Sequence, residues 1–368
     1  MILKKNISID LNIFLTIVAT LIVIGFIFVY SASSVYALET FGSSHYFIKK
    51  QFIGLIIGFV GLVAIQLIPT QFIKQSSPYF FMATLVLTAL TLLPGFAQRI
   101  HGSSRWLKFP GITFQPSELL KIGLILYVAF CISKQTKKYS FRYGYLPILT
   151  ILFLPSLILL KQPDFGLIVT LFITTLILLF IAQFELKHVM ITLLSLLPIA
   201  IGLIIMRPYR IQRILTFLNP WNDPKGAGFQ IIQSLIAIGS GGFLGTGLAH
   251  SKQKFFYLPM QHTDFIFAII AEETGFLGCI FLIGLSVALL YWGIKIAHQL
   301  KDLFSRFVVL GFVILISLQT TINIGVACGL LPTKGIGLPL VSYGNTALVC
   351  NIWMVGIIIN LIRSHEAH

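Results

Sequence analysis

The feature that most constrains the fold is a series of long apolar runs separated by short polar segments. A bilayer core about 30 Å thick is crossed by roughly 20 helical residues, because each residue adds about 1.5 Å to a helix. Ten runs approach this length: approximately 11–31, 51–68, 78–95, 117–133, 145–160, 165–183, 188–206, 265–297, 304–326 and 341–362. The sequence therefore predicts an all-α polytopic membrane protein with about ten transmembrane helices.

The composition excludes an ordinary water-soluble domain. Hydrophobic residues make up 57% of the 368, charged residues make up only 10%, and the mean hydropathy is +0.94. The net charge of +15 is spread between the apolar runs, so there is no basic domain that would bind a nucleic acid. Since no repeat or linker divides the chain, residues 1–368 are predicted to form a single membrane domain.

An even number of spans places both termini on one side of the membrane. With cytoplasmic termini, twelve Lys and Arg residues lie inside, thirteen lie outside and Lys121 lies within a helix. Six of the outer charges belong to the long segment 207–264, and long translocated segments follow the positive-inside rule poorly. We therefore predict cytoplasmic termini and a large extracytoplasmic loop, about 207–264, between the seventh and eighth helices. Its basic residues would suit a phosphate-bearing partner or lipid headgroups: Arg207, Arg210, Arg213, Lys225, Lys252 and Lys254.

The polar segment 258–267 places Asp264, with His262 beside it, at the mouth of the eighth run. A carboxylate at this depth is costly and is usually functional. Asp264 could accept a proton from a sugar hydroxyl, a general-base role that contributes about a hundredfold to ten-thousandfold in rate. It could also cap the helix that follows. Further along, Glu272 and Glu273 could face a polar cavity or pair with a cation.

Two other groups of polar residues lie at the fourth run, one inside its first turns and one upstream of it. Glu118 suits the positive end of a helix dipole, and Lys121 follows three residues later on the same face. The two form either a structural ion pair or a set of substrate contacts. Upstream, Arg105 could bind a phosphate bidentately while Trp106 anchors the membrane interface.

Two glycine- or proline-marked segments and one short apolar stretch are predicted to be irregular or short. The run 239–247 lacks the lysine and hydroxyl ending of a nucleotide-binding loop, which favours a turn or hinge. The stretch 229–238 is predicted to be an amphipathic or re-entrant helix. Segment 331–344 contains two prolines and three glycines, so it predicts the wall of a cavity in which Lys334 contacts an anionic headgroup.

Together these motifs resemble those of the SEDS family (FtsW/RodA/SpoVE), polytopic glycosyltransferases that polymerise lipid II into peptidoglycan. The resemblance extends from residues 29–33 to 343–344 and is closer to the cell-division type (FtsW) than to the elongation type (RodA). It rests on the segments 115–118, 162–166, 217–221, 233–242, 262–265 and 331–335. Two departures stand out: Met260 occupies a position where the family usually has glutamate, and Asn345-Thr346 replaces the usual Gly-Ser.

The resemblance implies that Asp264 is the catalytic base. It would deprotonate the acceptor hydroxyl, which attacks the lipid-linked donor and expels undecaprenyl pyrophosphate at the outer face of the bacterial cytoplasmic (inner) membrane. The predicted substrate-binding residues are Arg105, Glu118, Lys121, Lys252, Lys254, His262, Glu272 and Lys334. Arg105, Lys121 and Lys334 would stabilise the developing pyrophosphate charge. A divalent cation, Mg²⁺ or Mn²⁺, could share that task, although the sequence contains no dedicated metal site.

The expected ligands are lipid II and the undecaprenyl-linked glycan. The expected partners are a class B penicillin-binding protein transpeptidase and divisome membrane proteins, with no nucleic acid. Three alternatives stay open: an elongation-type polymerase, a lipid II flippase and a non-enzymatic divisome scaffold. A flippase would also suit ten helices with prolines and intramembrane charges, although the sequence shows no inverted repeat.

Overall fold

The computed structural model describes residues 2–100, 103–109, 112–134, 140–206, 208–255 and 258–367. Nearly all of these residues belong to helices. The α-helices are α1 (Ile2–Phe41), α2 (Tyr46–Ile65), α3 (Thr70–Leu90), α4 (Pro116–Lys134), α5 (Leu146–Thr150), α6 (Phe153–Lys161), α7 (Phe165–Ile181), α8 (Leu186–Ile205), α9 (Pro208–Leu218), α10 (Phe229–Ser240), α11 (Ile266–Gln299), α12 (Leu303–Ala327) and α13 (Asn345–Ala367). A π-helical turn, η1 (Phe141–Tyr145), precedes α5, and a 3₁₀ turn, η2 (Pro220–Asn222), follows α9.

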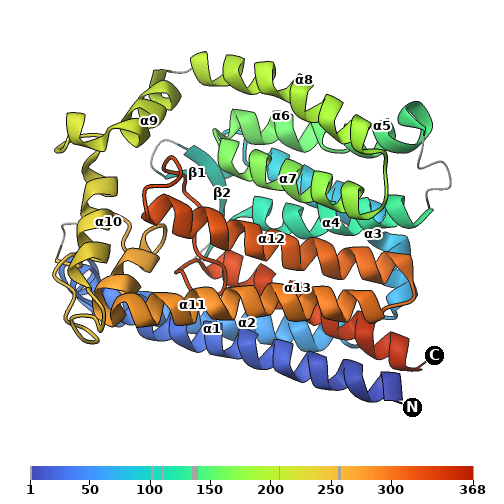
Figure 1. The fold of residues 1–368 in the computed structure, drawn as a ribbon, viewed down its shortest axis with the longest axis horizontal. Helices are drawn as coiled ribbons and strands as arrows, with labels where there is room; N and C mark the ends of the chain where they lie inside the picture. Colours follow the sequence, from blue (N-terminus) through green and yellow to red (C-terminus); the bar gives the residue numbers. More distant parts are fainter. Residues whose placement is uncertain are drawn as a thin grey trace.

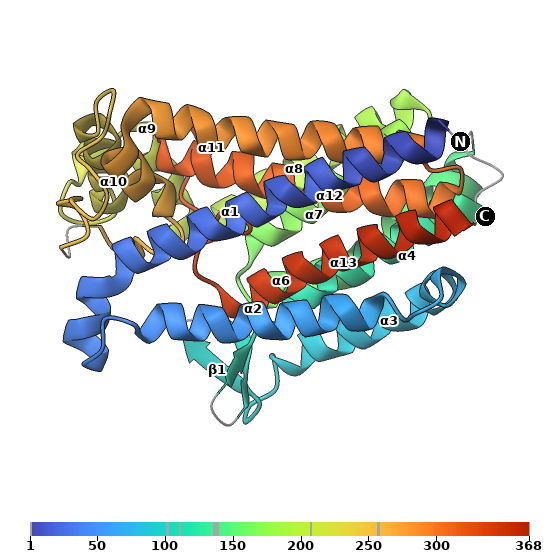
Figure 2. The same cartoon turned by 90° about the horizontal axis from the view of Figure 1, so that it is seen from below.

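The long helices run side by side along one axis of the molecule (Figure 1). Both chain ends lie at one end of the bundle, whereas α9 and α10 lie at the opposite end (Figure 1). The central helix is α12, which packs against α11, α4 and α7 and is mostly buried. From below, α2 lies beside α13 and α3 lies beside α4 (Figure 2). This arrangement confirms an all-α polytopic bundle with both termini at one end.

Eight helical segments of the described chain are long and apolar enough to cross a membrane: Ile7–Phe41, Tyr46–Ile65, Pro116–Lys134, Phe141–Lys161, Leu186–Ile205, Ile266–Gln299, Leu303–Ala327 and Asn345–His365. The two remaining predicted spans fold as α3 and as α7, an apolar helix of only 17 residues. The predicted break between the fifth and sixth spans lies between α6 and α7, where Asp164 accepts a hydrogen bond from the backbone N–H of Leu167 at 3.2 Å and caps α7.

A small antiparallel sheet was not predicted. Its strands are β1 (Ala97–Ile100), β2 (Ser103–Phe109) and β3 (Ile112–Phe114), in the order β1-β2-β3. Short connections favour antiparallel neighbours, because a parallel pair needs a long crossover. Strand β2 packs against α4 and carries Arg105 and Trp106 to the cavity described below. Gly102 and the side chain of Lys108, which flank these residues in the sequence, lie outside the described part of the structure.

The glycine-rich segment 239–247 forms the predicted turn, which packs directly on the backbone of α11. The backbone N–H of Gly247 donates to the Glu273 carbonyl at 3.1 Å. A Cβ atom at Gly245, whose φ is +83°, would lie 2.2 Å from the same carbonyl oxygen. Helix α11 is interrupted where the turn meets it, at Gly275 with φ 65° and ψ −162°. The turn and the interruption therefore form one close contact that positions the following loop.

Replacing Gly245 with alanine tests this contact. Gly245→Ala introduces a Cβ clash at a left-handed backbone position, and we expect a loss of about 1–3 kcal/mol in stability, seen as a lower melting temperature of the detergent-purified protein. Gly239→Ala is the matched control, because Gly239 lies in α10 and a Cβ atom added there would have open space within 4 Å among the described residues. Equal melting temperatures for the two variants would contradict the proposed contact.

Candidate active site

A cavity of about 880 Å³ lies among the loops and helix ends at the α9–α10 end of the bundle. Its wall includes β2, the start of α4, the α6–α7 connection, the loop before α11 and the loop between α12 and α13. Five of the nine predicted site residues line it: Arg105, Glu118, Lys121, Asp264 and Lys334. The predicted cavity wall at 331–344 is present and contributes much of this lining.

Asp264 lies in the loop before α11. Burial raises the pKa of its carboxyl group to about 6, although Arg105 and Arg213 oppose this shift. A carboxylate with such a pKa is a more effective proton acceptor near neutral pH than an ordinary, less basic one. Helix α11 begins at Ile266 and has no side-chain cap. The alternative interpretation of Asp264 as a helix cap is therefore wrong.

Two buried side chains hold the backbone around Asp264. Asn323 Nδ2 donates to the carbonyl oxygens of Asp264 and Ile336, each at 2.8 Å. The Ser342 hydroxyl donates to the Thr263 carbonyl at 2.6 Å. These bonds join the loop before α11 to the loop between α12 and α13. The carboxylate and the opposite cavity wall are thus fixed relative to each other.

The backbone next to Asp264 is also tightly constrained. A Cβ atom at Gly335 would lie 3.6 Å from Asp264 Oδ2 and 3.9 Å from Arg105 Nη1, at ordinary van der Waals distance, so Gly335 lies beside both groups. Met260 and Leu340, which both line the cavity, have φ values of +56° and +66°. Left-handed backbone is uncommon outside glycine and often accompanies functional sites.

Arg105 reaches from β2 to the connection between α6 and α7. Its Nε donates to the Gln162 carbonyl at 3.3 Å and its Nη2 donates to the Pro163 carbonyl at 2.7 Å. Its Nη1 lies 3.6 Å from Asp164 Oδ2. Burial raises the pKa of Asp164 while Arg105 opposes the shift. Asp164 was not predicted as a site residue, because its motif indicated only a break between two helices.

Glu118 and Lys121 form the predicted ion pair, with Nζ 2.6 Å from Oε2. Lys121 is only 2% exposed, and its Nζ also donates to Gln319 Oε1 at 3.4 Å. The two opposite charges neutralise each other. Because both side chains line the cavity, the pair still faces the space that a ligand would occupy.

Two further cations lie near Asp264. Lys334 lines the cavity, and burial lowers its pKa. Arg213, from α9, also lines the cavity and donates from Nη1 to the Thr333 carbonyl at 3.1 Å. The sequence placed Arg213 in the basic outer loop, but nothing in its spacing distinguished it from the other five basic residues there. Of those five, Arg207 lies outside the described residues.

The other four predicted site residues do not line the cavity: Lys252, Lys254, His262 and Glu272. Glu272 accepts hydrogen bonds from the backbone N–H of Lys252 at 2.8 Å and from the Ser251 hydroxyl. Lys254 Nζ lies 3.6 Å from Glu273 Oε1. These contacts attach the outer loop to α11. In the structure, Lys252, Lys254 and Glu272 therefore attach this loop to α11 and do not line the cavity.

His262 lies in an aromatic cluster instead of the cavity. Its ring centroid is 5.8 Å from that of Tyr36, 4.4 Å from that of Phe47 and 5.7 Å from that of Tyr343. Burial lowers the pKa of His262 to about 4, so the ring is neutral at physiological pH. The imidazole thus packs the Asp264 loop against α1, α2 and the segment before α13.

Replacing His262 tests this packing role through pH. A folded-state pKa of about 4, against about 6.5 when unfolded, means that the unfolded chain binds more protons between these values. Wild type should therefore lose about 2 kcal/mol of stability from this residue between pH 7.5 and pH 5, whereas His262→Phe should not. We expect the melting temperature of His262→Phe, relative to wild type, to rise as the pH falls. A constant difference would rule out a buried neutral imidazole.

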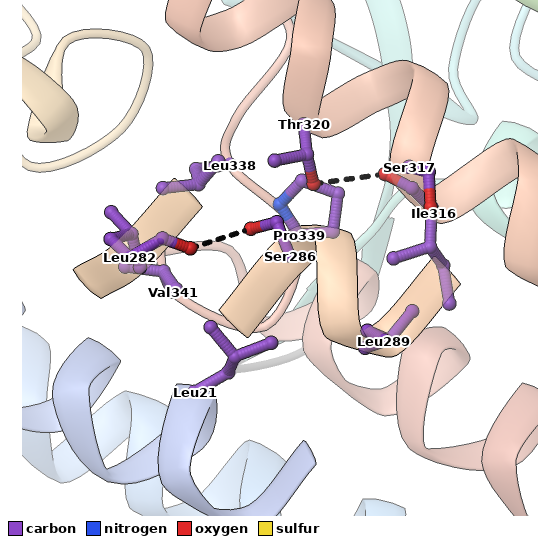
Figure 3. A pocket seen from close by; sticks show the side chains of 10 residues that line it. All are labelled: Leu21, Leu282, Ser286, Leu289, Ile316, Ser317, Thr320, Leu338, Pro339 and Val341. Carbon is purple, nitrogen blue, oxygen red and sulfur yellow. Dashed lines mark hydrogen bonds between the residues drawn. The ribbon is translucent and has the colours of Figure 1, made fainter. Parts of the chain in front are cut away.

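A second, much smaller cavity of about 10 Å³ lies between α1, α11 and α12 (Figure 3). The hydroxyls of Ser286 and Thr320 beside it donate to the carbonyls of Leu282 and Ile316 in their own helices, each at 2.9 Å. It has room for about one water molecule. Across the described residues, no group of three or more His, Cys, Asp or Glu could hold a metal ion.

Comparison with known proteins gives a consistent result. The family model for FtsW, RodA and SpoVE, described as "Cell cycle protein", matches residues 11–367. A "Probable peptidoglycan glycosyltransferase FtsW" from Trichlorobacter lovleyi is 41% identical over 96% of this chain and 92% of its own length. The "Stage V sporulation protein E" of Bacillus subtilis is 41% identical over 93% of this chain and 94% of its own length.

Solved structures show the same fold. One, described as "Structural coordination of polymerization and crosslinking by a peptidoglycan synthase complex", matches with a TM-score of 0.80 and 28% identity, over 96% of this chain and 97% of that chain. The rod shape determining protein RodA of Thermus thermophilus matches with a TM-score of 0.71 and 25% identity, over 96% of each chain.

Proposed function

Because the chain belongs to the FtsW/RodA/SpoVE family of cell cycle proteins, we propose that it is a cell-division peptidoglycan glycosyltransferase that polymerises lipid II. Its curated relatives include several named as probable peptidoglycan glycosyltransferase FtsW. The observation that carries the proposal is the partly buried Asp264 carboxylate, which has a raised pKa and shares its cavity with Arg105, Arg213 and Lys334. A base beside a group of cations suits glycosyl transfer from a pyrophosphate.

The reaction follows from this arrangement. Asp264 accepts the proton of a sugar hydroxyl on the acceptor strand or lipid II. The oxygen then attacks the anomeric carbon of the undecaprenyl-linked donor, and a new glycosidic bond forms. The bond from that carbon to the pyrophosphate oxygen breaks, and undecaprenyl pyrophosphate leaves with the electron pair.

The cations have distinct places in this mechanism. Arg105 is oriented by two backbone carbonyls, so little rearrangement is needed when negative charge develops on the pyrophosphate. Arg213 and Lys334 face the same cavity. Lys121 is paired with Glu118 at 2.6 Å, which is closer than the 3.6 Å between Arg105 and Asp164, so we assign most of the charge stabilisation to Arg105, Arg213 and Lys334. Where a divalent cation, Mg²⁺ or Mn²⁺, takes part, Asp164 in the cavity wall would hold it together with the pyrophosphate, and the cation would supply further positive charge for the leaving group.

The topology supports reaction at the outer face of the bacterial cytoplasmic membrane. The chain is a multi-pass membrane protein, and its termini lie opposite α9 and α10 (Figure 1). If the termini are cytoplasmic, the cavity and the basic helix α9 lie on the outer side. Residues 1–368 then act as one membrane domain whose loop at about 207–264 helps to build the site.

The partners follow from the same proposal. One structural neighbour is described as a peptidoglycan synthase complex that coordinates polymerization and crosslinking. A class B penicillin-binding protein transpeptidase, together with divisome membrane proteins, would serve as the corresponding partner of this chain. Lipid II and the growing glycan would occupy the cavity.

The alternative functions differ in what Asp264 must do. A flippase needs polar residues along a path but no base, and a scaffold needs neither. The raised pKa of Asp264 and the cations around it favour a catalyst over both. An elongation-type polymerase would use the same site, so cell-division defects on depletion distinguish it from the cell-division type.

Substituting Asp264 separates enzyme from scaffold. Purified Asp264→Asn should form glycan strands from lipid II at least about a hundredfold more slowly than wild type, because it loses the general base. It should still copurify with its transpeptidase. Asp302→Asn is the matched control, since Asp302 pairs with Lys74 at 3.0 Å and is not among the cavity-lining residues. Normal polymerisation by Asp264→Asn would refute the catalytic role.

The pH dependence of polymerisation tests whether Asp264 must be ionised to act as the base. Activity requires the ionised carboxylate, so kcat/KM should rise with pH through a pKa of about 6. Arg213 holds the pKa of Asp264 down, and Arg213→Gln should move this rise to higher pH. Arg363→Gln, at the exposed end of α13, should leave it unchanged. If Arg213→Gln leaves the rise of kcat/KM at the same pH, a group other than Asp264 controls that rise.

A further inference from the structure

We propose that Asn323 is a positioning residue for the transfer reaction: it holds the backbone of Asp264 from behind, so that the carboxylate keeps the place in the cavity that proton transfer requires. The proposal rests on the proposed function, because it concerns how the same base is held. Asn323 lies in α12, is only 1% exposed and is not among the cavity-lining residues. It would therefore act on the reaction only through Asp264.

The loop that carries Asp264 is held at three successive backbone carbonyls. The donors all come from α12 or from the loop between α12 and α13: the Tyr343 N–H donates to His262 at 2.9 Å, the Ser342 hydroxyl to Thr263 at 2.6 Å and Asn323 Nδ2 to Asp264 at 2.8 Å. Each of these bonds restrains the peptide and leaves the carboxylate of Asp264 to the cavity that it lines.

Asn323 differs from the other two donors in the element to which it belongs. Tyr343 and Ser342 lie in an irregular loop, whereas Asn323 lies in the central helix α12, which packs against α4, α7 and α11 and is mostly buried. One helical turn earlier, Gln319 Oε1 accepts a hydrogen bond from Lys121 Nζ at 3.4 Å. A site is held more accurately by a helix than by a loop. Helix α12 is therefore the fixed support to which the base is attached.

The chemistry of this contact requires a side-chain amide. The amino group of Asn323 also donates to the Ile336 carbonyl at 2.8 Å, so both of its hydrogens are used. A carboxylate of the same shape would place oxygen against two carbonyl oxygens, and an aliphatic side chain would donate to neither. Ile336 follows the cavity residue Lys334 by two positions. One amino group thus fixes the backbone of the base relative to the segment that carries a cation.

Positioning matters for the rate because a general base must lie within hydrogen-bond reach of the hydroxyl that it deprotonates. A displacement of about 1 Å can lower a rate about a hundredfold. Loss of the Asn323 bonds would free the Asp264 peptide to move, while Arg105 would keep its own bonds to the Gln162 and Pro163 carbonyls. We therefore expect the chemical step to suffer and substrate binding to persist.

The experiment compares kcat with KM for Asn323→Leu, which replaces the amide with an apolar side chain of similar size. Initial rates of glycan formation from lipid II are measured for the purified protein together with its copurifying transpeptidase. We expect kcat to fall at least about tenfold and KM to change by less than about twofold, because the lost interaction acts on the transition state and not on substrate binding.

Asn360, in α13, provides a matched control. Its Nδ2 also donates to two backbone carbonyls, those of Ile65 and Ile68, each at 2.8 Å, and it is not among the cavity-lining residues. Asn360→Leu therefore removes the same pair of bonds away from the site. Both variants should show a lower melting temperature, but only Asn323→Leu should lose kcat. A purely structural role for Asn323 would give the two variants the same kcat.

The outcomes separate the positioning role from the polymerase activity. If wild type forms glycan and Asn323→Leu matches Asn360→Leu in kcat, the activity stands and the positioning role falls. A rise in KM at unchanged kcat would also overturn it, because Asn323 would then act on binding. A wild type that forms no glycan would overturn the activity itself and the positioning role with it. If Asn323→Leu does not fold, the smaller Asn323→Ala takes its place with the same expected loss of kcat.

Discussion

The partial burial of the Asp264 carboxylate at the cavity wall is the physical condition on which the rest of the site depends. Desolvation raises its pKa to about 6, and Arg105 and Arg213 keep the shift from being larger. A carboxylate in this range is ionised at neutral pH yet basic enough to accept a proton. Without burial it would be a weak base, and without the nearby cations it would hold its proton more tightly.

The surrounding structure keeps this carboxylate in place through bonds to backbone rather than to the carboxylate itself. Asn323 joins the Asp264 and Ile336 carbonyls, and His262 packs the same loop into an aromatic cluster. At the α9–α10 end of the bundle, Glu272 and Glu273 attach the preceding loop to α11. The Asp264 carboxylate is thereby left facing the cavity, where it can contact a ligand.

The sequence was sufficient where one property decided the structure. Run length and hydropathy located the helices, and proline and charge marked the break before α7, because the bilayer leaves few alternatives to helices. The sequence was insufficient where packing between residues far apart in the chain determined the structure. The short β1–β2–β3 sheet packs through β2 against α4, and only the folded chain shows that Arg213 reaches the cavity while Lys252, Lys254, His262 and Glu272 do not. Asp264, Glu118 and Lys121 were identifiable because charges inside apolar runs are rare.

The most direct test is a titration of Asp264 itself. Infrared difference spectra of protein carrying ¹³C-labelled aspartate, recorded for wild type minus Asp264→Asn across about pH 4 to 8, isolate the carboxyl band of this residue. We expect a protonated-carboxyl band that disappears with a pKa of about 6. A band that titrates near the ordinary aspartate value of about 3.9 would show that the carboxylate is fully solvated, and would contradict its role as a base with a raised pKa.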